Sequence, residues 1–266
     1  EDDEKYPFRP ILCAGDDLTL VMRASDALDF SETFLQYFEA ETEKQLKAFK
    51  DKHEINTDDK LTAGLGIAFV KRTFPFHLAY QLSESLVSYA KDQTNRQYSA
   101  LAFHKVTSSS TLDYKEIVAK HLTLPTNSNY VLNYQPYTIE EEQSNYPHVS
   151  ALRHLIHTMQ DLPRGALRQV LSASYVDIQR SQQRLKRLHE VSDPKKWKAF
   201  VDAWNDLSNQ QVDIGDSKTI FIPSFTNSKE TTFYRSPLME AIELRSFMPS
   251  LEENSAQEQE CPDTIT

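Results

Sequence analysis

The sequence contains little cysteine and little glycine. Its 266 residues include only 2 cysteines and 5 glycines. Cys13 lies in an expected strand and Cys261 in a polar C-terminal stretch, so this pair suits neither a disulfide framework nor a zinc site. Free thiols are typical of a reducing compartment, and we therefore expect a cytoplasmic protein.

Long apolar runs and an excess of positive charge are also absent. The longest nearly uncharged run, LTAGLGIAFV, covers only 61–70, about half of the ~20 residues that cross a bilayer. No signal peptide is recognisable at the start, so we expect a soluble protein with no membrane contact. The formal net charge of −10 excludes a surface that binds nucleic acid throughout, but one basic face remains possible.

Strand and helix patterns alternate in the first half of the chain. The segments RPILCA and DLTLVMR predict two strands joined by a tight turn at Gly15 and Asp16, because glycine and aspartate suit turns. Helical spacing is present in 25–52 and 74–96, and strand-like runs in 61–70 and 98–106. A short helix at 112–121 and an edge strand at 130–138 would follow. This order predicts an α+β fold with helices packed on a sheet.

The second half of the chain has a mainly helical pattern. We expect helices at 148–160, 163–191 and 193–207, the second with Pro163 and the third with Pro194 in the first turn. Trp197, Phe200 and Trp204 recur at helical spacing, which indicates a core or a subunit interface. The acidic stretch 249–266 has no apolar period and is expected to be a disordered tail.

Two adjacent carboxylates, Asp16 and Asp17, fall at the tip of the expected hairpin, in CAGDD. Like charges side by side repel each other, and a divalent cation between them and a phosphate removes that cost. Carboxylates on rigid strands hold the paired metal ions of nucleotidyl transfer. The alternative is that both aspartates are ordinary turn residues, which is the commoner case for an isolated GDD.

Glycine placement and one lysine add to this pattern. Gly15, Gly64 and Gly66 lie in or beside the expected strands, where a backbone can approach a ligand closely. Lys91 ends an expected helix, where its ammonium could reach nucleotide phosphates. Taken alone, Lys91 is explained better as a favourable charge at a helix C-terminus.

The motifs CAGDDLTLVM, LTAGLGIAF and SESLVSYAK, in this order and at these separations, resemble the palm domain of nucleotidyl cyclases. The resemblance is closer to the second palm of the large subunit of type III CRISPR effector complexes than to diguanylate cyclases of the GGDEF type, whose signature continues with Glu and Phe where this chain has Asp17 and Leu18. It covers roughly 9–191, and it implies a ferredoxin-like sheet with packed helices, followed by a mainly helical region.

The resemblance also implies roles for individual residues. Asp16 and Asp17 would be catalytic and would hold Mg²⁺ or Mn²⁺ at the triphosphate of ATP. Lys91, Gly64 and Gly15 would contribute to nucleotide binding, with Gly15 letting the turn close. The family usually has a second glycine where this chain has Ala14, a departure of one methyl group that we expect to be tolerated.

Such palms begin with a further strand, which carries another metal-binding acid and precedes the hairpin. The charged run upstream of the hairpin lacks strand character, so the acids Asp2, Asp3 and Glu4 are not assigned to this role. We therefore expect either the downstream part of a longer protein or a palm that cannot complete its site alone. Three functions therefore remain open. The chain is an oligoadenylate-forming nucleotidyltransferase acting in antiviral defence, a catalytically silent palm with a structural role in an RNA-guided complex, or a GGDEF-like cyclase that uses GTP.

Charge and composition divide the chain further. We expect a palm-like domain at 1–137, a helical domain at 138–248 and the tail at 249–266. Lysine and arginine dominate 164–198. This segment could contact guide RNA or an acidic effector subunit. The alternative is an ordinary solvated helix face. An oligomer is possible.

Overall fold

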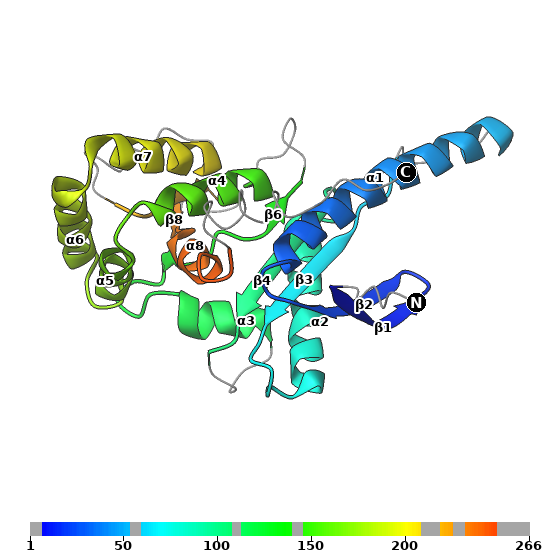
Figure 1. The fold of residues 1–266 in the computed structure, drawn as a ribbon, viewed down its shortest axis with the longest axis horizontal. Coiled ribbons are helices and arrows are strands. Elements are labelled where there is room, and N and C mark those ends of the chain that lie inside the picture. The colour runs from blue at the N-terminus through cyan, green and yellow to red at the C-terminus, as the bar shows by residue number, and fades with distance from the viewer. Residues whose placement is uncertain are drawn as a thin grey trace, which may run out of the picture.

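The computed structural model describes residues 7–53, 60–107, 113–139, 146–208, 219–225 and 232–248. Its first elements are β1 (Phe8–Ala14), β2 (Asp17–Met22), α1 (Ala27–His53), β3 (Gly64–Phe69), α2 (Phe76–Gln93), β4 (Ala100–Lys105), α3 (Tyr114–Ile117) and the π-helical turn η1 (Val118–Leu122). They are followed by β5 (Tyr130–Val131), β6 (Tyr137–Thr138), α4 (Val149–Gln160), α5 (Arg164–Ser174), α6 (Ile178–Val191), α7 (Pro194–Ser208), β7 (Ile222–Phe225), β8 (Thr232–Arg235) and α8 (Leu238–Leu244). The predicted α+β class is confirmed (Figure 1).

The central sheet contains β3, β4 and β6, in that order. β3 and β4 run parallel, paired from Gly64↔Ala100 to Phe69↔Lys105, and α2 is the crossover between them. Such a connection is required because parallel strands cannot be joined by a tight turn. β6 pairs with the beginning of β4 in the antiparallel direction. β3 is therefore one edge of this sheet.

Helices pack against both faces of the central sheet. Side chains alternate along a strand, so neighbouring residues of β4 contact different layers. On one face, Ala100 and Ala102 of β4 pack with α2 and α3. On the other face, Leu101 and Phe103 join a larger core that includes Leu28 of α1. The sheet is thus a layer between α2 on one side and α1 with the C-terminal part of the chain on the other.

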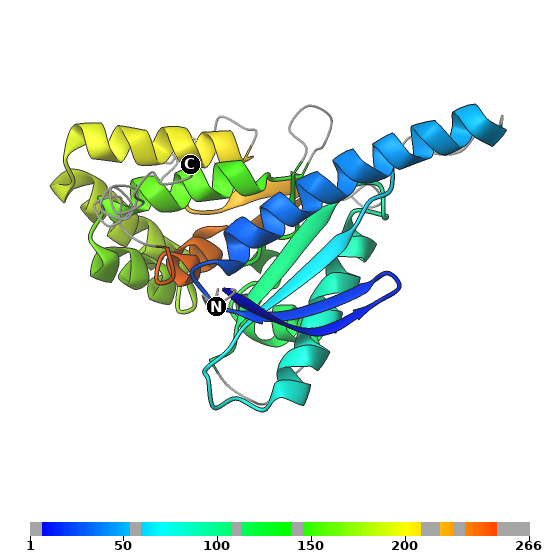
Figure 2. The same cartoon turned by 45° about the vertical axis from the view of Figure 1, so that its right-hand side comes forward.

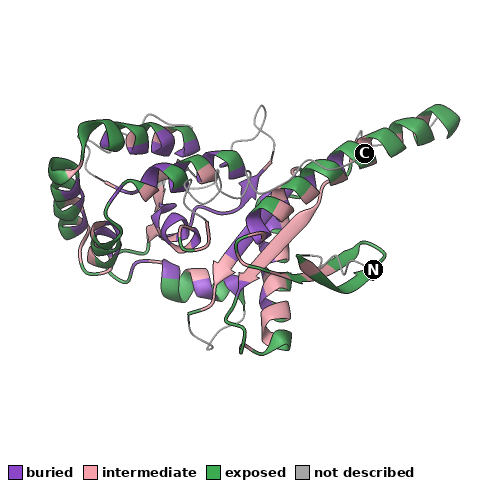
Figure 3. Ribbon diagram, viewed as in Figure 1, coloured by how far each residue is buried: buried purple, intermediate pink, exposed green. Residues whose placement is uncertain are grey.

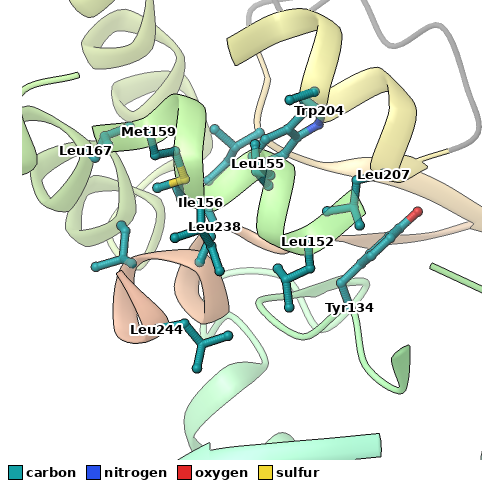
Figure 4. Close-up of a cluster of buried hydrophobic side chains, with 14 of the residues drawn as sticks. Tyr134, Leu152, Leu155, Ile156, Met159, Leu167, Trp204, Leu207, Leu238 and Leu244 are labelled. Atoms are coloured by element: carbon teal, nitrogen blue, oxygen red, sulfur yellow. The ribbon is translucent and has the colours of Figure 1, made fainter. Parts of the chain in front are cut away.

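Part of the larger core lies where α4 packs against α7 and α8 (Figure 4). Trp197, Phe200 and Trp204 are all buried there, which confirms the core interpretation of their spacing. Figure 4 shows Trp204 beside Leu155, with Leu238 of α8 nearby. The same core reaches the sheet residues, so apolar packing is continuous across the predicted boundary between 137 and 138. That boundary, and the tail at 249–266, which lies outside the described residues, remain predictions.

The predicted single helix 163–191 is wrong. The chain forms two helices, α5 and α6, that pack against each other. The break occurs at Tyr175–Asp177, where the Asp177 carboxylate accepts a hydrogen bond from the Gln179 amide at 3.1 Å and caps α6. The buried positions continue with helical spacing through the break, ending at Leu185 and Leu188, so periodicity alone does not reveal it.

Two strand predictions also need correction. The expected edge strand at 130–138 is two short strands in different sheets, since β6 pairs with β4 whereas β5 pairs with β8. The buried residues between them make side-chain hydrogen bonds instead of a regular ladder. The region after 139 is not purely helical either, because β7 and β8 form a second three-stranded sheet with β5.

Candidate functional site

The β1–β2 hairpin closes with a two-residue turn. Gly15 and Asp16 occupy the turn, and Ala14 pairs with Asp17 across it. Gly15 has a φ of +63° and Asp16 has a negative φ, the pattern of a type II′ turn, which takes glycine at its first central position. Asp16 therefore lies in the turn and Asp17 begins β2, so the predicted placement of both carboxylates at one tip is confirmed.

Neither aspartate has a partner within the described part of the chain. Both side chains are exposed, and no described residue forms an ion pair with them. No group of three or more His, Cys, Asp and Glu side chains that could hold a metal ion occurs among the described residues either. The hairpin therefore supplies two carboxylates and no third protein ligand.

This donor set fits one kind of metal site. Mg²⁺ is a hard cation that is commonly bound by one or two carboxylates, with water and substrate phosphates as the other ligands. Asp16 and Asp17 suit that arrangement because both are accessible and neither is neutralised by a described basic residue. A closed all-protein site, such as structural zinc, needs four ligands. Mg²⁺ or Mn²⁺ bound together with a triphosphate is thus the metal chemistry that the tip suits.

The hairpin is weakly attached to the rest of the fold. β1 and β2 form a sheet of their own, and most of their residues are exposed (Figure 3). Ile11 and Val21 are each 46% exposed. At the base of the hairpin, the Phe8 ring lies 5.6 Å from that of Phe30 on α1, and Met22 packs against the larger core. The base is therefore anchored, and the tip with its carboxylates is left accessible.

Lys91 and Gly64, both predicted to bind nucleotide, lie in contact. Lys91 is in the last turn of α2, and Gly64 begins β3. A Cβ on Gly64 would lie only 2.6 Å from Lys91 Cγ. The missing side chain of Gly64 thus makes room for the alkyl chain of Lys91, which is half-buried. The contribution of either residue to nucleotide binding stays a prediction.

Gly66 has a structural reason of its own. A Cβ at this position would lie 2.2 Å from the Ser83 carbonyl oxygen and 2.9 Å from the Val87 amide nitrogen. Contacts that short do not occur, so only glycine allows α2 to approach β3 this closely. The sequence predicted that the backbone at Gly66 approaches a ligand closely; in the structure it is α2 that lies against this glycine.

β3 has a free edge on the side of the hairpin. The sheet order places β4 on one side of β3, and no described strand pairs with its other side. Figures 1 and 2 show β3 lying on the hairpin side of β4. Backbone groups at such an edge can pair with a further strand. The free edge agrees with the interpretation that a palm of this kind needs one more strand than the described residues contain.

Sequence reasoning missed a buried polar cluster beside the central sheet. The Gln135 side chain accepts a hydrogen bond from the Phe103 amide at 2.5 Å and donates to the Phe103 carbonyl at 2.9 Å. It also donates to Tyr114 Oη at 2.8 Å, and Asn133 Nδ2 donates to Tyr89 Oη at 3.0 Å. The run 130–138 has a strand-like pattern, so the sequence did not indicate that these two amides are buried. Their burial is tolerated because they are hydrogen-bonded.

A buried carboxylate ties α8 to the same region. Glu240 is 3% exposed; it accepts a hydrogen bond from the Tyr134 amide at 2.7 Å and another from Tyr137 Oη. Burial raises the pKa of Glu240 to about 7, against the effect of these hydrogen bonds and of Arg235. The burial of Glu240 could not be predicted from its sequence neighbours, because its partner Tyr137 lies far away along the chain. This cluster stabilises the junction between sheet and helices and contains no residue predicted for the nucleotide site.

The structure places the basic segment 164–198 on α5, α6 and the start of α7. These helices lie at the end of the molecule away from the hairpin (Figure 1). The basic segment and the aspartate tip are therefore separate sites. In the described residues, no helix is long and apolar enough to span a membrane.

Comparison with known protein families gives a match to part of the chain. No curated protein matches the chain. Residues 4–100, which contain the hairpin, α1, β3 and α2, match the family model described as Cas10/Cmr2, second palm domain. The resemblance to the second palm of type III CRISPR large subunits is thereby confirmed for this stretch of the chain.

Proposed function

We propose that this chain provides the palm of a magnesium-dependent nucleotidyltransferase in type III CRISPR effector complexes, which joins ATP into cyclic or linear oligoadenylate in antiviral defence. One observation carries this proposal. Two adjacent, exposed carboxylates without a described side-chain partner lie at the type II′ turn of the hairpin, inside the segment that matches the palm family. An ordinary solvated turn has no need of a second carboxylate beside the first, since adjacent like charges are unfavourable.

Each residue of the site has a distinct role in this proposal. Asp16 and Asp17 would hold the divalent cation, and the backbone at Gly15 would keep the turn narrow enough for a triphosphate to approach. Lys91 would contact the phosphates with its ammonium group, while Gly64 leaves the space in which the lysine chain lies. The bound cation would supply charge stabilisation to the phosphate oxygens.

The proposed reaction is a nucleotidyl transfer between two ATP molecules. The 3′-hydroxyl oxygen of one nucleotide forms a bond to the α-phosphorus of the other, and the bond from that phosphorus to the β-phosphate bridging oxygen breaks. The hydroxyl proton leaves to solvent, and pyrophosphate is released. Charge develops on the leaving oxygens, where a cationic side chain such as Lys91 is most effective.

A catalytically silent palm is the second candidate, and one observation favours it. The described residues give the hairpin two carboxylates and no third ligand, whereas paired metal ions generally need more. A further strand at the free edge of β3, from outside the described residues or from a neighbouring subunit, would be the place for another acid. Neighbouring effector subunits and a guide RNA are the proposed partners, the latter through the basic segment 164–198.

The test is product formation from ATP and Mg²⁺ in the assembled effector complex, analysed by chromatography and by pyrophosphate release. We expect oligoadenylate from the unchanged protein and none from the Asp16→Asn/Asp17→Asn variant. The matched control is Asp202→Asn/Asp206→Asn, which changes the charge equally on the exposed side of α7 and should retain activity.

The other outcomes separate the alternatives. If neither ATP nor GTP gave a product, the proposal would be overturned in favour of the silent palm. Cyclic diguanylate from GTP would favour a GGDEF-like cyclase. Undiminished oligoadenylate from the hairpin variant would remove Asp16 and Asp17 from the active site.

A further inference from the structure

A concave site lies between α5 and α6, at the opposite end of the molecule from the hairpin (Figure 1). Its volume is about 720 Å³, within the roughly 300–1,000 Å³ range of small-molecule sites. The lining is dominated by four arginines and two glutamines, which are Arg168, Arg180, Arg184, Arg187, Gln169 and Gln183. No acidic residue lines it. The groove is therefore strongly basic in a chain of net charge −10.

The charge of this region is not neutralised locally. Residues 164–198 contain nine basic and three acidic side chains, which gives +6, so the rest of the chain carries −16. Nearby lysines are paired, with Lys186 Nζ 3.9 Å from Glu190 and Lys196 Nζ 3.0 Å from Asp161. None of the four groove arginines has an ion-pair partner among the described residues. The positive potential thus remains available to a ligand.

The arginines are held on a rigid support. Arg180, Arg184 and Arg187 share one face of α6 at helical spacing, and the adjoining face buries Leu185 and Leu188 in the core. The two helices are connected by a hydrogen bond from Ser181 Oγ to the Val170 carbonyl, at 3.0 Å. Because the buried face fixes α6 against α5, the backbone of the groove needs no rearrangement, and the ordering required on binding is that of the arginine side chains.

The composition of the groove favours a phosphate backbone over a protein partner. Guanidinium groups form paired hydrogen bonds to phosphate oxygens and are less strongly hydrated than ammonium groups. A protein interface generally has an apolar core, but Ala173 and Val176 are the only apolar side chains that line this groove. A duplex is read by an element that protrudes into its groove, whereas this surface is hollowed. A single strand fits the shape.

We propose that the α5–α6 groove binds the backbone of single-stranded RNA over a few nucleotides. The hydroxyl of Ser172 and the amides of Gln169 and Gln183 lie among the arginines, and such neutral groups can hydrogen-bond a ribose 2′-hydroxyl, which is both donor and acceptor. This inference deepens the partner part of the proposed function. It is independent of nucleotidyl transfer, because the groove and the hairpin are separate sites.

The experiment measures fluorescence anisotropy of a labelled 12-nucleotide RNA of mixed sequence with the full chain, without ATP or Mg²⁺. We expect the Arg180→Gln/Arg184→Gln variant to bind about tenfold more weakly at low salt. For four phosphate contacts, the slope of log K against log salt should be about −3, and each lost arginine should reduce its magnitude by about 0.7. The exposed positions of these arginines make folded variants the expectation, to be checked by circular dichroism.

The matched control is Lys44→Gln/Lys47→Gln on α1, which removes the same charge at the other end of the molecule. It should bind RNA as the unchanged chain does. Equal loss in both variants would overturn the proposal, because it would show that only net charge matters. Equally tight binding of DNA of the same sequence, or displacement by a poly-glutamate peptide at the same charge concentration, would also contradict it. Since neither ATP nor Mg²⁺ is present, failure here leaves the test of nucleotidyl transfer unaffected.

Discussion

The hairpin and the α4–α7–α8 region are built in opposite ways. In the hairpin, apolar side chains such as Ile11 and Val21 are almost half exposed, and the turn has two unpaired carboxylates. In the helical region, Trp204 and Phe200 are fully buried, and the internal Glu240 has hydrogen-bond partners. Apolar packing stabilises the second region, while the first gains little from its contacts with the rest of the chain.

This difference indicates that the hairpin, unlike the helical region, depends on a further segment or subunit. Exposed apolar side chains next to a free strand edge are generally a surface that another segment covers. Stability should therefore come mainly from the two cores on either side of the central sheet and little from the hairpin. The function of the hairpin should depend on a further segment that covers it. Matched substitutions in the two regions test this difference.

The largest expected effect is on the core side. Trp204→Ala would remove a fully buried ring from the contact between α4 and α7 and should lower the free energy of unfolding by about 3–5 kcal/mol. The matched change in the hairpin, Val21→Ala, should cost under about 0.5 kcal/mol, because this side chain is 46% exposed. Urea titrations followed by circular dichroism measure both. Similar losses in the two variants would contradict the comparison.

The next effect depends on pH. Burial raises the pKa of Glu240 to about 7, whereas a glutamate in the unfolded chain titrates near the ordinary value of 4.5. Between these values the folded state binds more protons than the unfolded state, so stability is present at low pH and is lost as the pH rises toward 7. From pH 5 to pH 8 the free energy of unfolding should fall by about 2 kcal/mol from this group.

The variant Glu240→Gln should remove this contribution and leave a further dependence of the same sign, because burial also raises the pKa of Glu243, to about 8. Glu190→Gln on the exposed side of α6 is the control and should leave the pH dependence unchanged. If the Glu240→Gln variant kept the full dependence, the assignment to this carboxylate would be wrong.

A smaller effect concerns the approach of α2 to the sheet. Gly66→Ala places a methyl group 2.2 Å from the Ser83 carbonyl oxygen and should destabilise the fold by about 1–3 kcal/mol. Gly165→Ala in α5 is the counterpart. No atom lies within 4 Å of the added carbon, so it should stabilise by about 0.5–1 kcal/mol through the unfolded state. Thermal melts of the two variants would shift in opposite directions; a shift to lower temperature in both would contradict the packing argument.

The smallest effect on stability is expected at the hairpin tip. Asp16→Asn/Asp17→Asn removes a repulsion between two exposed charges, which is worth a few tenths of a kcal/mol at most. The free energy of unfolding, measured in urea, should therefore hardly change. A loss above about 1 kcal/mol would show that the aspartates have a structural role that the contacts do not reveal.

The same two regions differ in how far the sequence predicts them. The hairpin was predicted residue by residue, because Gly15 and Asp16 are turn residues for local reasons. The crossover from β3 through α2 to β4 was also predictable, since its helical and strand periods are clear. The aspartate tip, Gly64 and Lys91 could be named as site candidates in this way, and Gly64 and Lys91 are indeed in contact.

Elements that depend on distant partners were not predictable. The strand β5 pairs with β8, which lies about a hundred residues later, so the run 130–138 gave no sign of being divided between two sheets. The break between α5 and α6 leaves the apolar period intact, and only the capping role of Asp177 marks it. Glu240 reads as a surface residue of a short helix, because its burial depends on partners at Tyr134 and Tyr137.

The central claim is that the hairpin tip binds a divalent cation, and paramagnetic line broadening by Mn²⁺ tests it most directly. In the full chain with a non-hydrolysable ATP analogue, the amide signals around Gly15–Leu18 should broaden selectively on addition of Mn²⁺. Excess Mg²⁺ should compete with Mn²⁺ and restore these signals. In the Asp16→Asn/Asp17→Asn variant the signals should stay sharp. Broadening elsewhere in the chain, or equal broadening in that variant, would contradict the account.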